Sequence, residues 1–179
     1  MKKIYIVLTH TGTILSRIIQ SYTKDEFSHV SIALDIELQE MYSFGRLNPY
    51  NPFIGGFIHE YIDKGTFKRF KKTVTKIVEL DIDESQYIKL KNTIKHIQNE
   101  KEQYKFNVIG MFAVGFNIKV KAKNSFFCAE FVKHVIEESN IDMKLPELIR
   151  PESFKDLDGA KEIYRGLLRE YKVPMLQNV

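Results

Sequence analysis

Apolar and polar residues alternate in several short stretches of the chain, and such alternation predicts β-strands. The first stretch, Lys3 to Leu8, is also rich in β-branched residues. Further strands are expected at His29 to Asp35, Met41 to Gly45, Phe57 to Ile62 and Val74 to Ile82. Turns are predicted at Asn48 to Pro52 and at Gly55-Gly56, because proline, glycine and asparagine favour turn conformations.

Helical spacing of apolar residues appears in three other segments. Helices are expected at Ile14 to Tyr22, from Asp83 to about Lys101, and from Phe126 to about Glu138. Asp83 with Gln86 has the spacing of a capping box, and Asn124 and Ser125 can cap the third helix. The tail, from Glu162 to Tyr171, is expected to end as a strand or a short helix. Runs of strands separated from helices predict an α+β fold with a mainly antiparallel sheet.

The length favours one domain. The chain has 179 residues, 44% of them hydrophobic and 28% charged, which is typical of an ordinary globular protein. We therefore expect residues 1–179 to form a single domain. No glycine-rich loop joins a strand to a helix, so the sequence gives no support to a nucleotide-binding fold.

Cysteine content and apolar runs bear on the compartment. The single cysteine excludes an intramolecular disulfide. The first apolar stretch, Ile4 to Leu8, is shorter than the roughly 7–15 residues of a signal-peptide core. The longest later stretch, Phe106 to Ile118, is shorter than the ~20 residues that span a bilayer. We expect a cytoplasmic protein without a transmembrane helix.

The charge is mildly basic, with a formal net charge of +4 and a pI near 9.0. Two groups of basic residues are denser than the rest: Lys68, Arg69, Lys71, Lys72 and Lys76 form one, and Lys119, Lys121 and Lys123 form the other. Such groups are either solvated faces or a surface for anionic lipid, polymer or nucleic acid. Neither group is diagnostic, and we do not expect nucleic acid as a partner.

Cys128 is the candidate nucleophile. If Ser125 caps the third helix, Cys128 lies in its first turn, where free backbone N–H groups and the helix dipole favour a negative charge. That position favours the thiolate form and offers N–H groups to an oxyanion. Free cysteine is also among the most buried residue types, so a structural thiol packed against Phe127 and Phe131 is the alternative.

His29 is the candidate base. Side chains alternate along a strand, so His29, Ser31 and Ala33 share one face, and the small residues leave room for a nucleophile to approach. The other four histidines, His10, His59, His96 and His134, compete for the role. His96 lies on a charged helix and is expected to be exposed.

A third polar group is needed to orient an imidazole and fix its tautomer. Ser43, on the neighbouring strand, is the candidate across the sheet. Glu40 or Glu60 would be a stronger electrostatic partner, but the pattern does not place either beside His29.

These segments together resemble a known family. The stretches SHVSIALD around His29, MYSFGR around Ser43 and SFFCAEFV around Cys128 are similar to those of the circularly permuted NlpC-type papain-like enzymes, in particular the YiiX/YycO-like group. The likeness covers most of the chain. It implies a papain-like fold with Cys128 as nucleophile, His29 as base and Ser43 as orienter. Relatives commonly have His, Glu, Asn or Gln at the third position, so Ser43 departs from the pattern.

The resemblance implies a cofactor-independent cysteine hydrolase or acyltransferase that forms a thioester acyl-enzyme. The substrate would contain an amide or ester bond, in a peptide, a cell-wall peptide, a lipid or another small molecule, and contact with a membrane surface stays open. The alternative is a non-catalytic binding module that retains the cleft. The run Phe106 to Ile118 is either ordinary core or a wall for an acyl chain. No metal or organic cofactor is expected, since paired-ligand spacing is absent, and the sequence does not indicate an oligomeric state.

Overall fold

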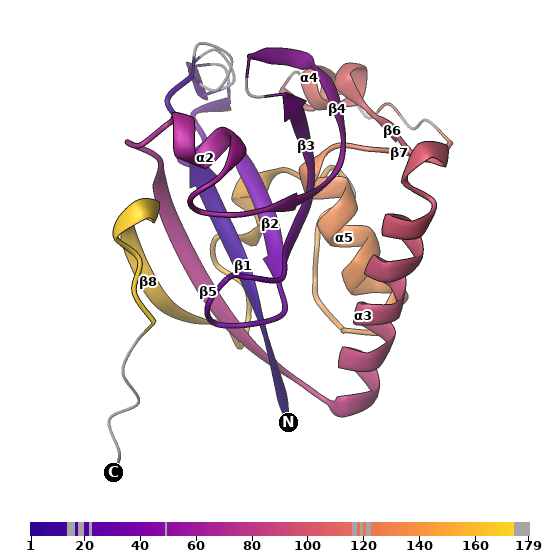
Figure 1. The fold of residues 1–179 in the computed structure, drawn as a ribbon. Coiled ribbons are helices and arrows are strands. Elements are labelled where there is room, and N and C mark those ends of the chain that lie inside the picture. The colour runs from indigo at the N-terminus through magenta and orange to yellow at the C-terminus, as the bar shows by residue number, and fades with distance from the viewer. Residues whose placement is uncertain are drawn as a thin grey trace.

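An antiparallel sheet with helices packed on it forms the body of the protein (Figure 1). The computed structural model describes residues 1–13, 17, 20–21, 23–48, 50–115, 118, 120 and 123–173, with only the backbone of residues 52, 53 and 115. The strands are β1 (Lys2–His10), β2 (His29–Ala33), β3 (Met41–Asn48), β4 (Asn51–Glu60), β5 (Val74–Ile82), β6 (Lys105–Phe106), β7 (Ser125–Phe126) and β8 (Lys161–Leu167). The α-helices are α2 (Gly65–Arg69), α3 (Glu84–Asn99), α4 (Val108–Gly115) and α5 (Cys128–Glu138). Short 3₁₀ helices lie at Lys101–Gln103, Pro151–Phe154 and Leu168–Glu170.

Six strands form the main sheet in the order β4-β3-β2-β1-β5-β8, and every neighbouring pair is antiparallel. The two-residue strands β6 and β7 form a separate parallel pair. The predicted α+β class with a mainly antiparallel sheet is therefore confirmed.

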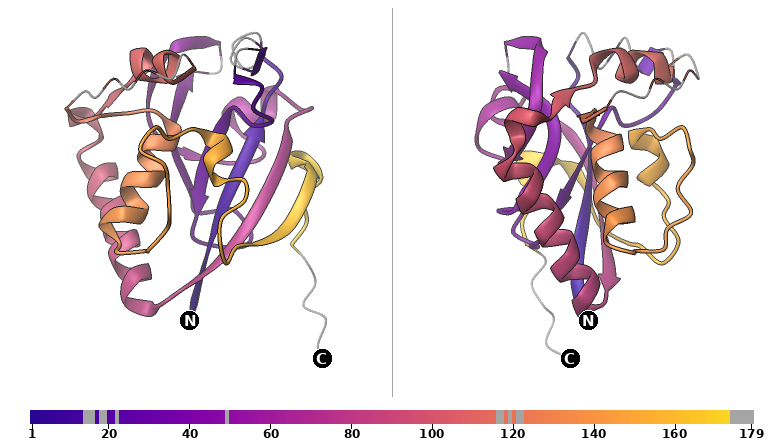
Figure 2. Two further views of the ribbon diagram at one scale, coloured as in Figure 1. Left: turned by 180° about the vertical axis from the view of Figure 1, so that it is seen from behind. Right: turned by 90° about the vertical axis from the view of Figure 1, so that its right-hand side faces the viewer.

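Residues of β1 alternate between two apolar cores. Ile4, Ile6 and Leu8 face α3 and α5 and belong to the larger core, while Tyr5 and Val7 belong to a smaller core on the other face. Figure 2 shows α3 and α5 on the same face of the sheet. The smaller core includes Phe67 of α2 and Leu168 of the last 3₁₀ helix. Burial on both faces explains why β1 is almost continuously apolar.

The predicted turn at Gly55-Gly56 is wrong, because both glycines lie inside β4. A Cβ atom at Gly55 would lie 2.5 Å from the ring of Phe106 and 2.8 Å from the carbonyl oxygen of Gly45. Glycine is present here because β6 and β3 approach the backbone closely, not because the chain turns. The predicted turn at Asn48 to Pro52 is present but tighter, since β4 already begins at Asn51.

Two of the three predicted helices are present in the structure, and one of them begins later than predicted. Most of the segment Ile14 to Tyr22 lies outside the described residues. The helix expected from Asp83 is α3, with Asp83 as its N-cap. The helix expected from Phe126 begins two residues later, at Cys128, with Phe127 as N-cap, and ends at Glu138 as predicted. Ser125 lies in β7 and does not cap it.

The capping box of α3 gives a testable contribution to stability. The Asp83 carboxylate accepts a hydrogen bond from the Gln86 amide at 2.8 Å, and the Gln86 side chain accepts one from the Asp83 amide at 3.0 Å. We expect Asp83→Ala to lower the free energy of unfolding by about 1 kcal/mol. Urea denaturation measures the change. The control Lys95→Ala, exposed in the same helix, should leave it within about 0.5 kcal/mol; equal effects of the two substitutions would contradict the capping role.

Candidate active site

Cys128 is held at the first position of α5. The residue before it, Phe127, donates its backbone N–H to the Glu130 carboxylate at 3.1 Å, and that carboxylate also accepts from Asn107 Nδ2 at 3.2 Å. These bonds fix the turn that leads into the helix. The side chain of Cys128 is buried, with 5% of the residue exposed. The sulfur therefore lies beside the unpaired N–H groups of a helix N-terminus.

His29, the first residue of β2, lies close to the Glu60 carboxylate and the Cys128 thiol. Its Nε2 lies 3.1 Å from Glu60 Oε1 and 3.3 Å from Glu60 Oε2. The Cys128 side chain is also close enough to the ring to raise the pKa of His29. The exposed fraction is 18% for the His29 side chain and 7% for that of Glu60. The ring is thus enclosed, and its two partners come from β4 and from the start of α5.

Ser31 completes the group. Its hydroxyl lies 3.3 Å from His29 Nε2 and donates to Glu60 Oε2. Ser31 is fully buried and, like His29, belongs to β2, two residues further on and on the same face of the strand. The Glu60 carboxylate therefore has two polar partners in the core, as a buried charge requires.

Gly45 makes this arrangement sterically feasible. β3 lies between β2 and β4 in the sheet, so the ring of His29 and the carboxylate of Glu60 meet over β3. A Cβ atom at Gly45 would lie 3.3 Å from His29 Cε1 and 3.9 Å from Glu60 Oε1. The glycine leaves space for the ring where any other residue would press on it.

The surroundings of His29 favour its charged form. Burial opposes protonation, but the Glu60 carboxylate and hydrogen bonds with Cys128 and Glu60 outweigh it and raise the pKa of His29 from 6.5 to about 10. These partners therefore favour the imidazolium form of the ring. Nε2 is the ring nitrogen that lies against the Glu60 carboxylate.

The structure thus brings together two of the three residues selected from sequence, Cys128 and His29. Ser43 is not part of the group: its hydroxyl donates to the carbonyl oxygen of Val30 at 2.8 Å, and its side chain is fully buried. The orienting contact to His29 comes from Glu60 instead. The register explains the difference, since the β3 residue beside the ring is Gly45, two positions beyond Ser43.

The other histidines lie elsewhere. His10 pairs with Ser28, His59 with Gln39 and Tyr61, and His96 with Glu100. The side chain of His96 is 61% exposed, as predicted. His134 stacks on Phe126 with ring centroids 5.0 Å apart, and burial lowers its pKa. Only His29 has the contact to Cys128 that a base requires.

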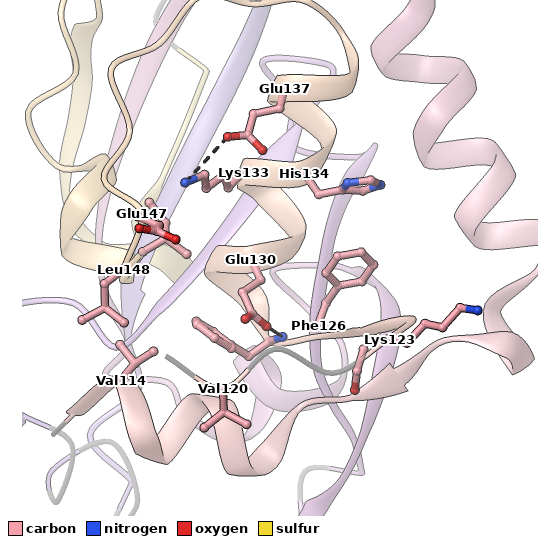
Figure 3. Close-up of a pocket in the computed structure, with 13 residues that line it drawn as sticks. Val114, Val120, Lys123, Phe126, Glu130, Lys133, His134, Glu137, Glu147 and Leu148 are labelled. Atoms are coloured by element: carbon pink, nitrogen blue, oxygen red, sulfur yellow. Dashed lines mark hydrogen bonds and ion pairs between the residues drawn. The ribbon is translucent and has the colours of Figure 1, made fainter. Parts of the chain in front are cut away.

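Two hollows lie near the start of α5. A cavity of about 30 Å³ is bordered by Cys128, Ser28 and Met111. It shares Val114 and Phe127 with an open groove of about 600 Å³ that runs along α5 (Figure 3). The groove therefore lies beside the small cavity that Cys128 borders.

The groove has a mixed lining. Glu130, Lys133 and Glu137 project from α5, and Glu147 and Leu148 lie opposite them in Figure 3. The amine of Lys133 is occupied: it donates to the carbonyl oxygen of Pro146 at 2.7 Å and lies 3.6 Å from Glu137. The lining does not by itself indicate one ligand.

The run Phe106 to Ile118, expected to be either core or a wall for an acyl chain, contains both buried and exposed residues. Met111 packs against the larger core and lines the small cavity, whereas Phe112 is 36% exposed. Phe106 packs against the core and approaches Gly55. Phe116 lies outside the described residues. A role of this run in binding an acyl chain stays a prediction.

Comparison with known proteins adds no family. No family model, curated protein or solved structure matches the chain. The resemblance to permuted papain-like enzymes therefore stays a prediction. Among the residues with described positions, no three His, Cys, Asp or Glu side chains are grouped to hold a metal ion. None of the helices in the described ranges is long and apolar enough to cross a membrane.

Proposed function

We propose that the protein is a cofactor-independent thiol hydrolase or acyltransferase of the permuted papain-like type. Cys128 is the nucleophile, His29 the general acid and base, and Glu60, with Ser31, the group that orients the imidazole. The observation that carries the proposal is the placement of His29 between the Cys128 side chain and the buried Glu60 carboxylate. A nucleophile, a base and an orienter in hydrogen-bonded sequence are the signature of an activated nucleophile.

The proposed reaction begins from a thiolate, which the neighbouring imidazolium stabilises. The sulfur of Cys128 attacks the carbonyl carbon of an ester or amide, and backbone N–H groups at the start of α5 stabilise the oxyanion. When the tetrahedral intermediate collapses, the bond to the leaving group breaks and His29 donates a proton to the leaving oxygen or nitrogen. The product of this half-reaction is a thioester on Cys128.

The second half-reaction releases the acyl group. His29, now neutral, takes a proton from water or from an acceptor hydroxyl or amine, and that group attacks the thioester carbonyl. Collapse of the second intermediate regenerates the thiolate and the imidazolium. Water as acceptor makes the enzyme a hydrolase, and any other acceptor makes it a transferase.

Thiol labelling tests the proposal without knowledge of the substrate, because Cys128 is the sole cysteine. We expect iodoacetamide to alkylate the native protein at pH 6 at least about tenfold faster than it alkylates glutathione, since the imidazolium supports a thiolate where an ordinary thiol, with a pKa near 8.5, is protonated. Mass spectrometry of timed samples gives the rate. His29→Asn should slow the labelling to the rate of an ordinary thiol or below.

A matched control is His134→Asn, which alters a half-buried histidine of α5 that stacks on Phe126. It should leave the labelling rate within about twofold. Alkylation that occurs only after denaturation would identify Cys128 as a buried structural thiol and would overturn the proposal.

A further inference from the structure

Large apolar side chains are exposed at one end of the molecule. Ten large hydrophobic residues with described positions are exposed, and six of these belong to the β3–β4 hairpin, to α4 or to the residues just after α4. These six, which we call the apolar end, are Leu47, Tyr50, Ile54, Ile109, Phe112 and Ile118. Tyr50 is 77% exposed and Ile109 is 72% exposed. Exposed apolar residues gathered in this way mark an interaction surface.

The figures show that the two segments lie at the same end. In Figures 1 and 2 the turn between β3 and β4 and helix α4 both lie at the end where α5 begins. The segments also touch, since Phe106, just before α4, lies against Gly55 of β4. The apolar end therefore lies beside the start of α5, which carries Cys128.

Three segments that contribute to this end carry basic charges and no acidic ones. The segments 41–59, 64–78 and 103–129 contain eleven of the 27 Lys and Arg residues and none of the 23 Asp and Glu residues. The guanidinium carbon of Arg69 lies 3.8 Å from the centroid of the Tyr50 ring, so α2 joins its basic side chains to the tip of the hairpin. Lys68, Lys71 and Lys72 beside it are exposed.

Three of the basic residues grouped in the sequence are not counted in this surface. Lys76 is buried and pairs with Asp156 at 3.2 Å and with Glu162 at 3.3 Å. Lys119 and Lys121 lie outside the described residues. The exposed cations of the three segments with described positions are thus Lys64, Lys68, Arg69, Lys71, Lys72, Lys105 and Lys123.

We propose that the apolar end docks on the surface of an anionic lipid bilayer. Apolar and tyrosine side chains would enter the interface between headgroups and acyl chains, while the surrounding lysine and arginine side chains contact acidic headgroups. The three segments carry only basic charges. A bilayer with acidic lipids matches them with a continuous anionic surface, whereas a protein partner would need acidic residues at each matching position. A second step rests on the proposed function: the bond that Cys128 attacks belongs to a molecule that resides in the membrane.

Vesicle flotation tests docking with the purified full chain. We expect binding to phosphatidylcholine vesicles that contain about one third phosphatidylserine, and at least about tenfold weaker binding to pure phosphatidylcholine. The variant Tyr50→Ser/Ile109→Ser is altered at two highly exposed positions. It should bind the anionic vesicles at least about tenfold more weakly than the wild type does. Lys68→Gln/Lys72→Gln should lower affinity for anionic vesicles and leave binding to neutral vesicles unchanged.

The matched control is Ile88→Ser. Ile88 is 51% exposed and lies near the start of α3, at the opposite end of the molecule in Figure 1. It should bind vesicles as the wild type does. No binding to either vesicle, or equal loss in Ile88→Ser and Tyr50→Ser/Ile109→Ser, would overturn the proposal. A wild-type dimer that Tyr50→Ser/Ile109→Ser converts to a monomer would also overturn it, because a second copy would then occupy this end.

Docking and catalysis are separable in this design. Cys128→Ala should bind anionic vesicles as the wild type does, since Cys128 is buried and contributes nothing to the exposed surface. Failure of flotation would therefore leave the thiol reactivity of Cys128 untouched, and failure of labelling would leave docking untouched.

Discussion

Cys128→Ala and His29→Asn should each lower turnover by a factor of at least about 10³ on any ester or amide that the wild type cleaves, because nucleophile and base act as a unit. The substrate is found by screening the purified protein against peptide, amide and lipid-ester panels. Without the sulfur no thioester forms, and without the imidazole neither proton transfer of the proposed reaction occurs. The double variant should be no worse than either single variant.

The choice of asparagine at position 29 keeps the test interpretable. His29→Ala would leave the Glu60 carboxylate buried with Ser31 as its remaining partner, and an unpaired buried charge costs several kcal/mol. Asparagine retains a donor for Glu60, so the fold should persist. Circular dichroism and thermal melting confirm folding. A folded Cys128→Ala that retains the wild-type rate would contradict the role of Cys128 as nucleophile.

Much of the sheet could be predicted because its strands are bounded by clear turns and its periodicity is regular. Val74 to Ile82 is a strand over the range predicted, and the capping box at Asp83 marks where α3 begins. The pair Gly55-Gly56 predicts a turn but lies in a strand, because glycine is common both in turns and where another chain segment comes close. Sequence alone cannot distinguish these cases, since the approach of Phe106 depends on tertiary packing.

The site could be predicted only in part. Cys128 and His29 were identified from their local settings, a helix start and a strand with small residues on one face. Glu60 could not be placed, because its position relative to His29 depends on the register of the β3–β4 hairpin. A regular ladder continued from the Asn48–Asn51 pair would place Ile58 opposite Met41. The register shift between Arg46 and Asn48 places Glu60 there instead, on the same side of the sheet as Ser43 and Gly45.

The register also explains why the sequence favours Ser43 as the orienting residue. A serine on the strand next to His29 is a reasonable neighbour when the strand pairing is unknown, and Ser43 is indeed buried on the same side of the sheet as Glu60. Its hydroxyl instead bonds to the backbone of β2, at the Val30 carbonyl oxygen. A glutamate two strands away reaches the ring because Gly45, between them, has no side chain.

Glu60→Gln should lower turnover by about 10²- to 10⁴-fold, the range expected when acid–base catalysis is impaired. Glutamine has the size of glutamate but lacks its charge, so the attraction that favours the His29 imidazolium is lost while burial of the ring, which lowers the pKa of His29, remains. The base then titrates at lower pH. In the wild type the alkaline limb of the pH–rate profile should lie near pH 10, and in Glu60→Gln it should move towards neutral pH.

The same charge pair should make stability depend on pH. Because the folded pKa of His29, about 10, exceeds its ordinary value of 6.5, the pair stabilises the fold fully below pH 6.5 and loses this contribution as the pH rises towards 10. The free energy of unfolding should therefore fall more steeply over that window in the wild type than in Glu60→Gln. Ser43→Ala is the matched control: it removes the bond to Val30, costs about 1 kcal/mol of stability and leaves the alkaline limb in place. If Ser43→Ala shifts the limb and Glu60→Gln does not, the serine is the orienting group after all and Glu60 is only a buried partner of Ser31.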